Sequence, residues 1–205
     1  MTNYIMVTGP AAVGKSTLCS QLSNELPAFF YKPAMAYFDL SKLNNIPQEK
    51  MFSLIDSNVA IEYFCEICKK YDTIVGDQHL AIQPKKDSAL AAGKLIKTSV
   101  NEPFVSAIDY NIFNKMHESN ILPIIVYLKA NPEVLFERAY RRNVETGFPI
   151  RNKTLNEVIE EVMAEEYYYI ELIKATSIDS VTFDTSKTGA DVICSEVKKL
   201  VRKRR

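Results

Sequence analysis

The sequence has no excess of either charge and no long apolar run. Its 25 basic and 25 acidic side chains cancel, so no field of the whole molecule would gather nucleic acid or a membrane surface. The start, "MTNYIMV", lacks the charged stretch and the apolar core of a signal peptide, and no segment approaches the length of a membrane span. The one local exception is the basic tail "KKLVRKRR", where a solvated helix end is favoured over a contact with polyanions. We expect a cytoplasmic protein with no nucleic-acid or membrane partner.

Cysteine is scarce and its spacing completes no metal site. Of the four cysteines, Cys65 and Cys68 have the C-x-x-C spacing. They lie in the apolar helical pattern "VAIEYFCEICKKY", and no second pair of Cys or His accompanies them. The pattern favours a place in a helix core, and nothing in the cysteine usage indicates an oxidising compartment.

Repeats, low-complexity linkers and a second domain are also absent, so residues 1–205 are expected to form a single domain. Strand patterns alternate with helical ones, which predicts an α/β fold in three layers, a parallel five-stranded sheet with helices on both faces. The predicted strands cover residues 4–8, 28–31, 72–76, 122–128 and 181–184, and the predicted helices cover 15–26, 48–70, 102–117, 132–142, 154–175 and 189–205.

The stretch "GPAAVGKST" fits G-x-x-x-x-G-K-[ST], with a strand before it and a helix after it. Backbone N–H groups of such a loop and the helix N-terminus face a multiply charged phosphate. Lys15 is expected to reach the outer phosphates, and Ser16 to offer its hydroxyl to Mg²⁺. The pattern therefore predicts a P-loop NTPase fold that binds ATP with Mg²⁺. The expected nucleotide-binding residues are Gly9, Ala11, Ala12, Val13, Gly14, Lys15, Ser16 and Thr17.

Two classes of P-loop protein lack their motifs here. The only near match to the guanine-reading N-K-x-D is "NKMH", which has no Asp and lies in a helical segment. No apolar run ends in the Asp-Glu pair of motor ATPases. Small-molecule kinases and non-catalytic relatives remain.

The segment "YLKANPEVLFERAYRRNVETG" favours a kinase. It reads as a strand, a turn, a helix and then a polar stretch that carries arginines. A kinase must exclude water from the transferring phosphoryl group, and a flap with Arg138, Arg141 and Arg142 would cover the site and offset negative charge. We place this lid at about residues 139–153. The alternative is a solvated helix face on which the arginines pair with Glu133, Glu137 and Glu145.

Within this segment, "YLKANPEVLFERAYRR" resembles the Y-L-x-x-x-P-E-x-x-x-x-R-x-x-x-R stretch of the deoxynucleoside kinases, which are related to the thymidylate kinases. The resemblance runs from the first strand through the lid to the last strand. It implies that Arg138 borders the adenine of ATP and that Arg142 points at the phosphates. A further lid arginine of the family is Val144 here. The turn after the last strand would place Thr185 beside the adenine, although an ordinary strand-to-helix connection explains that composition equally well.

The family's acidic box at the end of the third strand reads "VGDQHL" in this chain. Asp77 falls on the acidic position, where a carboxylate beside the phosphate loop can hold Mg²⁺ through water. Gln78 replaces the family's arginine, which removes a cation near the transferred phosphate. His79 is a candidate to compensate in part, and a structural hydrogen bond is its more ordinary role.

The acceptor side departs further from the family. Lys32 precedes Pro33 in "FFYKPAMAYFDL", where the family has a glutamate that acts as base toward the substrate hydroxyl. Tyr37 matches the family's aromatic residue and is expected to stack on a flat substrate, and Asp39 is the nearest carboxylate able to act as base. Alternatively, Lys32 binds an anion, such as a substrate that already carries phosphate.

These residues predict ATP-dependent phosphoryl transfer to a small acceptor bearing a hydroxyl or a phosphate, with a (deoxy)nucleoside as the expected acceptor. A nucleoside monophosphate kinase and an antibiotic or other metabolite kinase on the same scaffold are alternatives within this class. A nucleotide-binding regulatory protein without catalysis is the alternative of another class. The choice between ATP and GTP, and between a monomer and a homodimer, stays open at this stage.

Overall fold

The computed structural model describes residues 1–32, 39–40, 42–47, 57–77, 107–146 and 154–204. Its strands are β1 (Thr2–Thr8), β2 (Phe29–Tyr31), β3 (Thr73–Asp77), β4 (Ile121–Lys129) and β5 (Ser180–Asp184). Its helices are α1 (Lys15–Glu25), α4 (Ser57–Cys68), α6 (Ala107–Glu118), α7 (Pro132–Thr146), α8 (Leu155–Thr176) and α9 (Ala190–Arg202).

The five strands form one parallel sheet in the order β2-β3-β1-β4-β5. Strand β1 lies in the middle, with β3 on one side and β4 on the other. All seven of its residues are buried, as is typical of a central parallel strand covered on both faces. The chain first forms β2 and β3 on one side of β1 and then crosses to β4 and β5 on the other side. Ligands bind to such sheets at the carboxyl ends of the strands where the strand order reverses, which here is beside β1.

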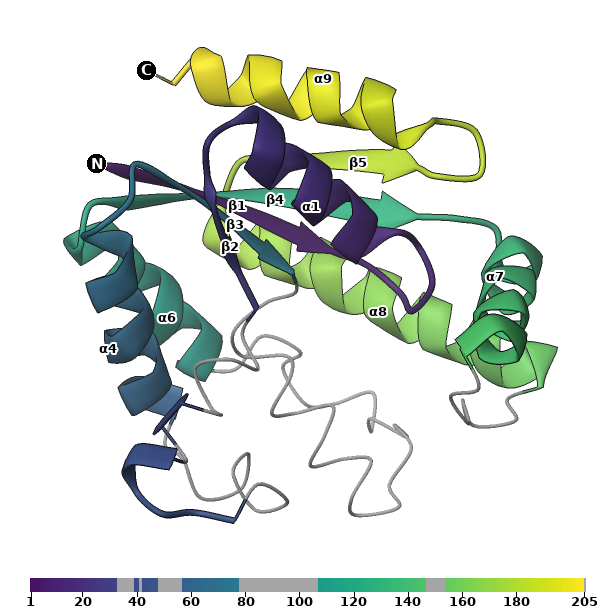
Figure 1. The fold of residues 1–205 in the computed structure, drawn as a ribbon, viewed down its shortest axis with the longest axis horizontal. Helices are drawn as coiled ribbons and strands as arrows, with labels where there is room; N and C mark the ends of the chain where they lie inside the picture. Colours follow the sequence, from purple (N-terminus) through teal and green to yellow (C-terminus); the bar gives the residue numbers. More distant parts are fainter. Residues whose placement is uncertain (33–38, 41, 48–56, 78–106, 147–153, 205) are drawn as a thin grey trace.

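Helices cover both faces of this sheet, as Figure 1 shows. Helices α1 and α9 lie together on one face, and α4, α6 and α8 lie on the other. Helix α7 lies beyond the carboxyl end of β4. The predicted three-layer fold with a parallel five-stranded sheet is therefore confirmed. No helix among the described residues is both long enough and apolar enough to cross a membrane.

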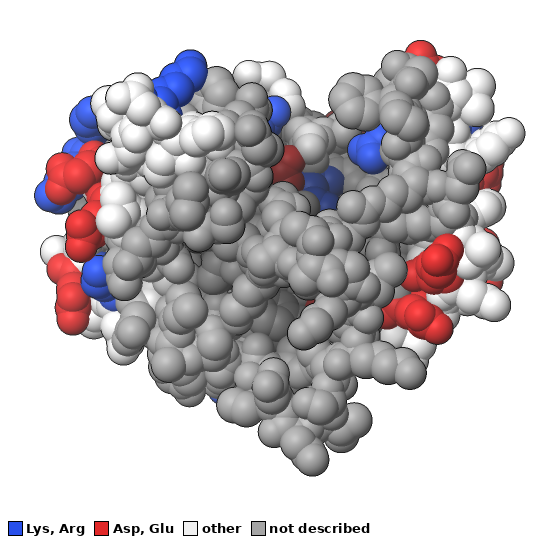
Figure 2. Space-filling view, turned by 90° about the horizontal axis from the view of Figure 1, so that it is seen from below, with Lys and Arg blue, Asp and Glu red and all other residues white. Residues whose placement is uncertain are grey.

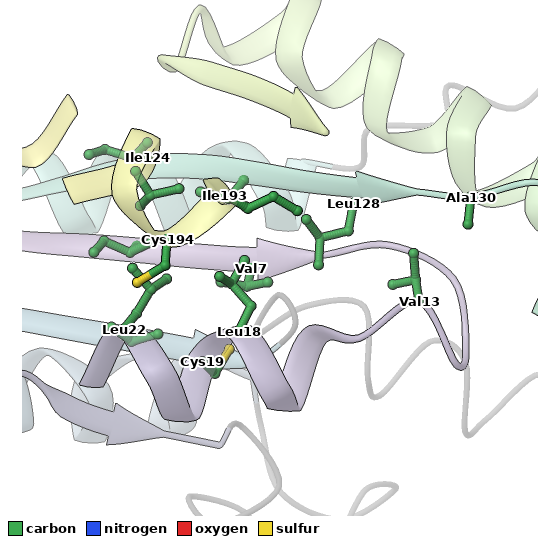
Figure 3. Close-up of a cluster of buried hydrophobic side chains, with 14 of the residues drawn as sticks. Val7, Val13, Leu18, Cys19, Leu22, Ile124, Leu128, Ala130, Ile193 and Cys194 are labelled. Atoms are coloured by element: carbon green, nitrogen blue, oxygen red, sulfur yellow. The ribbon is translucent and has the colours of Figure 1, made fainter. Parts of the chain in front are cut away.

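Each face has its own apolar core. The core under α1 and α9 joins side chains such as Val7 of the sheet to Leu18 and Leu22 of α1 and Ile193 of α9 (Figure 3). Burying an aliphatic side chain of this size stabilises the fold by about 1.5–3 kcal/mol. Val13, in the loop after β1, belongs to the same core with 1% of its surface exposed. The phosphate-binding loop is thus anchored to the core from within its own sequence.

Most predicted boundaries that fall on described residues agree with the structure to within two residues, and the end of α7 does not. The predicted helix starts at residues 48 and 102 lie outside the described residues. Helix α7 was predicted to end at Arg142, but it continues to Thr146. Residues 143–146 contain neither Gly nor Pro, and the first such residue is Gly147, so polarity alone gave too early an end. The first part of the predicted lid is therefore helical, and residues 147–153 lie outside the described residues.

Candidate functional site

The loop between β1 and α1 has three residues with positive φ angles. Gly9 and Gly14 have φ angles of +139° and +100°, and Ala12 has a φ of 63°. A Cβ atom on Gly9 would lie 2.1 Å from the carbonyl oxygen of Leu128. Gly9 is therefore required both by its backbone angle and by the approach of β4, whereas a Cβ on Gly14 would meet open space.

The N-terminus of α1 has no side chain that caps it. Gly14 is its N-cap residue, and no side-chain hydrogen bond satisfies the first turn. Helix α8 shows the contrast, because Thr154 and Glu157 form a complete capping box there. The free N–H groups of the first turn of α1 and its positive dipole end are thus left to an anion, as the motif predicts.

Lys15 is buried, with 8% of its surface exposed, although it carries the charge expected to meet phosphate. Its Nζ donates to the carbonyl oxygens of Gly9 and Pro10, each at 2.8 Å. Burial lowers the pKa of Lys15 to about 8, against the opposing effect of Asp77, while the positive charge of Arg142 lowers it further. The loop therefore holds its lysine in place through its own carbonyl oxygens, and no acidic side chain of the described residues forms an ion pair with it.

Ser16 and Asp77 meet across the gap between α1 and β3. The hydroxyl of Ser16 donates to Oδ2 of Asp77 at 2.6 Å. Asp77 is the last residue of β3, next to β1 in the sheet. A hydroxyl and a carboxylate at this position offer the oxygen ligands that Mg²⁺ prefers, so the donors fit the ion that the motif predicts.

Arg138 and Thr185, both predicted to border the adenine, contact each other directly. Arg138 donates to Oγ1 of Thr185 at 3.0 Å and to its backbone oxygen at 2.9 Å. A third bond joins the same two segments, from the backbone N–H of Asn131 to Oγ of Ser186 at 2.9 Å. These bonds fix α7 to the turn after β5. Whether adenine binds beside them stays a prediction.

The three arginines of α7 differ in what they do. Arg141 pairs with Glu137 at 2.9 Å on the exposed face of the helix, in agreement with the alternative of a solvated pair. Arg142 lies close enough to Lys15 to act on its pKa. Only Arg138 and Arg142 thus connect the helix with the site.

The predicted acceptor residues are only partly described. Asp39 accepts a hydrogen bond from the hydroxyl of Tyr63 in α4 at 2.9 Å, and no described contact joins it to the phosphate loop. Lys32 is exposed at the end of β2, with its Nζ 5.3 Å from the centre of the Phe30 ring. Tyr37, Gln78 and His79 lie outside the described residues.

Two supports of the loop have no clear signal in the sequence. The hydroxyl of Thr8, the residue before Gly9, donates to the hydroxyl of Tyr169 in α8. Gly76, which precedes Asp77, leaves room for Tyr4, since a Cβ there would lie 2.5 Å from the Tyr4 hydroxyl oxygen. Tyr169 is itself buried in the core of the other face. Only the packing of elements far apart in the sequence reveals these partners.

Seen from the side of the grey segments, the surface is hollowed between two lobes (Figure 2). Lys and Arg side chains lie in this hollow beside an acidic side chain. Positive side chains beside an acidic one suit a nucleotide phosphate chain held together with a metal ion.

Comparison with known proteins agrees with this geometry. A curated cytidylate kinase of Mesomycoplasma hyopneumoniae (strain 232) is 22% identical over 96% of this chain and 92% of that protein. The solved YorR protein of Bacillus subtilis, in complex with phosphorylated GDP, has a TM-score of 0.58 at 21% identity, over 97% of this chain and 95% of that one. Deoxyadenosine kinase from M. mycoides, with dCMP and dCDP bound, has a TM-score of 0.57 at 15% identity, over 99% and 100% of the two chains. The family model described as deoxynucleoside kinase matches residues 5–202. The chain belongs to the deoxynucleoside kinase family and is a P-loop kinase, as its resemblance to that family implied.

Proposed function

We propose that this kinase transfers the γ-phosphoryl group of Mg·ATP to a small acceptor of the nucleoside class. One observation carries the proposal: the Ser16 hydroxyl and the Asp77 carboxylate meet at 2.6 Å, directly beside the buried Lys15. A loop that only bound phosphate would not require a carboxylate opposite its serine. The cytidylate kinase and the deoxyadenosine kinase among the similar proteins support an acceptor of this class.

Each described residue has a role in this proposal. The N–H groups of the loop and of the first turn of α1 bind the phosphates. Lys15 exchanges its two carbonyl partners for phosphate oxygens, and Arg142 adds positive charge from α7. Arg138 holds α7 against the turn at Thr185 and so fixes the wall expected beside the adenine.

Ser16 and Asp77 would hold the magnesium ion, Ser16 directly and Asp77 through water. Bound there, the ion would offset the charge that develops between the outer phosphates. Residues 139–153 would act as the lid that excludes water, with Arg142 on its helical part.

We also propose a cytoplasmic location, because all four cysteines are free and buried, as is typical of proteins in a reducing compartment. Of the two assemblies that the sequence leaves open, a monomer and a homodimer, we propose the homodimer.

The proposal is tested by following labelled γ-phosphate from ATP to a panel of nucleosides and nucleoside monophosphates. We expect a labelled product with at least one acceptor, and none with Lys15→Ala. If nucleotide binds normally and no acceptor is labelled, the proposal is wrong and the chain is a nucleotide-binding protein without transferase activity.

A further inference from the structure

Lys32 stands beside Asp77 at the carboxyl edge of the sheet. In the parallel pairing of β2 with β3, Tyr31 lies opposite Gly76. Lys32 and Asp77 are the next residues of their strands, so they leave the sheet at the same level. Both side chains lie on the α1 face, because the Lys32 amine is 5.3 Å from the Phe30 ring centre and Asp77 bonds to Ser16 of α1.

The charge of Lys32 acts inside the phosphate-binding region. Burial and Asp77 raise the pKa of the Cys19 thiol, and the positive charges of Lys15 and Lys32 oppose that shift. Lys32 is exposed, and no ion pair joins it to an acidic group in the part of the chain that the structure describes. Its amine is thus an exposed cationic group at the edge where β3 ends in Asp77.

Two acidic residues that the sequence predicts for the site, Asp77 and Asp39, already accept hydrogen bonds. Asp77 accepts the bond from Ser16, and Asp39 accepts the bond from Tyr63. Lys32, which lies beside Asp77, offers hydrogen-bond donors and no carboxylate. These groups are poorly suited to deprotonate a neutral hydroxyl acceptor. An acceptor whose attacking oxygen is already ionised needs no base.

A phosphate monoester is such an acceptor, with a charge of about −1.5 to −2 near neutral pH. Its oxygen attacks the γ-phosphorus of ATP, a new P–O–P bond forms, and the bond from the γ-phosphorus to the bridging oxygen of ADP breaks. The electron pair of that bond leaves with ADP, so the products are ADP and a diphosphate, and no proton has to move.

We propose that the acceptor of this enzyme carries a phosphate group, as a nucleoside monophosphate does, and that Lys32 binds that phosphate beside Asp77. The inference rests on the proposed function, since it names the acceptor class of the same site. Loss of the ammonium removes a charge-assisted hydrogen bond to the phosphate, so acceptor binding should weaken by roughly 10- to 100-fold.

The test is steady-state kinetics of the full chain with ATP and matched pairs of nucleosides and their 5′-monophosphates. We expect kcat/KM to favour the monophosphates by at least 100-fold. Lys32→Met should raise the KM of the monophosphate by roughly 10- to 100-fold with little change in the KM of ATP. Lys32→Arg should retain most of the affinity. Lys70→Met, which removes an exposed lysine remote from the site, is the matched control. Titration with monophosphate alone should show the same loss in Lys32→Met.

Several results would overturn this inference. Preferred use of nucleosides would overturn it while leaving the proposed function intact. A Lys32→Met variant that binds monophosphate as well as the wild type would do the same. A raised KM for ATP in Lys32→Met would also overturn it, because Lys32 would then bind the phosphate donor. Transfer to no acceptor of either kind would instead overturn the proposed function, and this inference with it.

Discussion

At the scale of single residues, Lys15 sets the charge of the phosphate-binding loop before nucleotide binds. Its ammonium is buried and contacts two carbonyl oxygens. Burial brings its pKa down to about 8, so the empty site holds a lysine that is only partly charged in mild alkali. Phosphate oxygens replace the carbonyls when nucleotide binds and favour the charged form.

We therefore expect nucleotide binding to take up a proton above neutral pH. With a free-site pKa of about 8, uptake should rise from near zero at about pH 7 toward one proton at about pH 9. Affinity should fall as pH rises above about 8, by up to about tenfold per pH unit, because the bound form carries more protons. Calorimetry in two buffers of different ionisation enthalpy measures the uptake.

Lys15→Arg is the control for this experiment, because a guanidinium stays charged over the whole range and should show no uptake. Binding to the wild type without proton uptake at about pH 9 would contradict the assignment of Lys15 to the phosphates.

At the scale of elements, α7 is held against the turn that follows β5, the edge strand of the sheet. Arg138 makes two bonds to Thr185, whereas Arg141 has an exposed partner one turn away on its own helix. The spacing within the helix does not distinguish these arginines, and the family resemblance gave roles to Arg138 and Arg142 but none to Arg141. The structure separates them, because the turn after β5 comes within reach of only one face of the helix.

We expect Arg138→Ala to lower the free energy of unfolding by about 1–3 kcal/mol, since it removes two charged hydrogen bonds from a partly buried position. Arg141→Ala should change it by no more than about 0.5 kcal/mol, as for other exposed pairs within a helix. Urea unfolding of both variants measures the difference. Equal effects would show that α7 is not fixed through Thr185.

The elements also show what a sequence can reveal. The strands and the phosphate loop were predictable because apolar runs and the G-x-x-x-x-G-K-[ST] spacing are local signals. The end of α7 was not, since polar residues continue a helix as readily as they leave it. The bond between Thr8 and Tyr169, and the space at Gly76 for Tyr4, depend on contacts between distant elements, which leave no local pattern.

At the scale of the whole molecule, two apolar cores hold one sheet between two helical layers. Lys15, Ser16 and Asp77 come together at the carboxyl edge of that sheet. The residues predicted for phosphate and metal meet there because β1 and β3 are neighbours and α1 starts directly beyond β1. The residues predicted for the acceptor follow β2 and β3, and several of them lie outside the described part of the chain. The arrangement of the residues that would bind ATP and the metal thus follows from the strand order. How the acceptor would bind depends on Lys32 and on the residues that follow β2 and β3.

The central claim is that Ser16 and Asp77 hold one metal ion for phosphoryl transfer. The most direct test is the rate of transfer from ATP in Ser16→Ala, Asp77→Asn and the double variant, over a range of Mg²⁺ concentrations. Ser20→Ala, an exposed serine on the same helix, is the control. We expect each single variant to lower kcat by roughly 100- to 1,000-fold. The kcat of the double variant should be close to that of the slower single variant, because both residues serve the same ion. A wild-type rate in Asp77→Asn, or effects that multiply in the double variant, would contradict the claim.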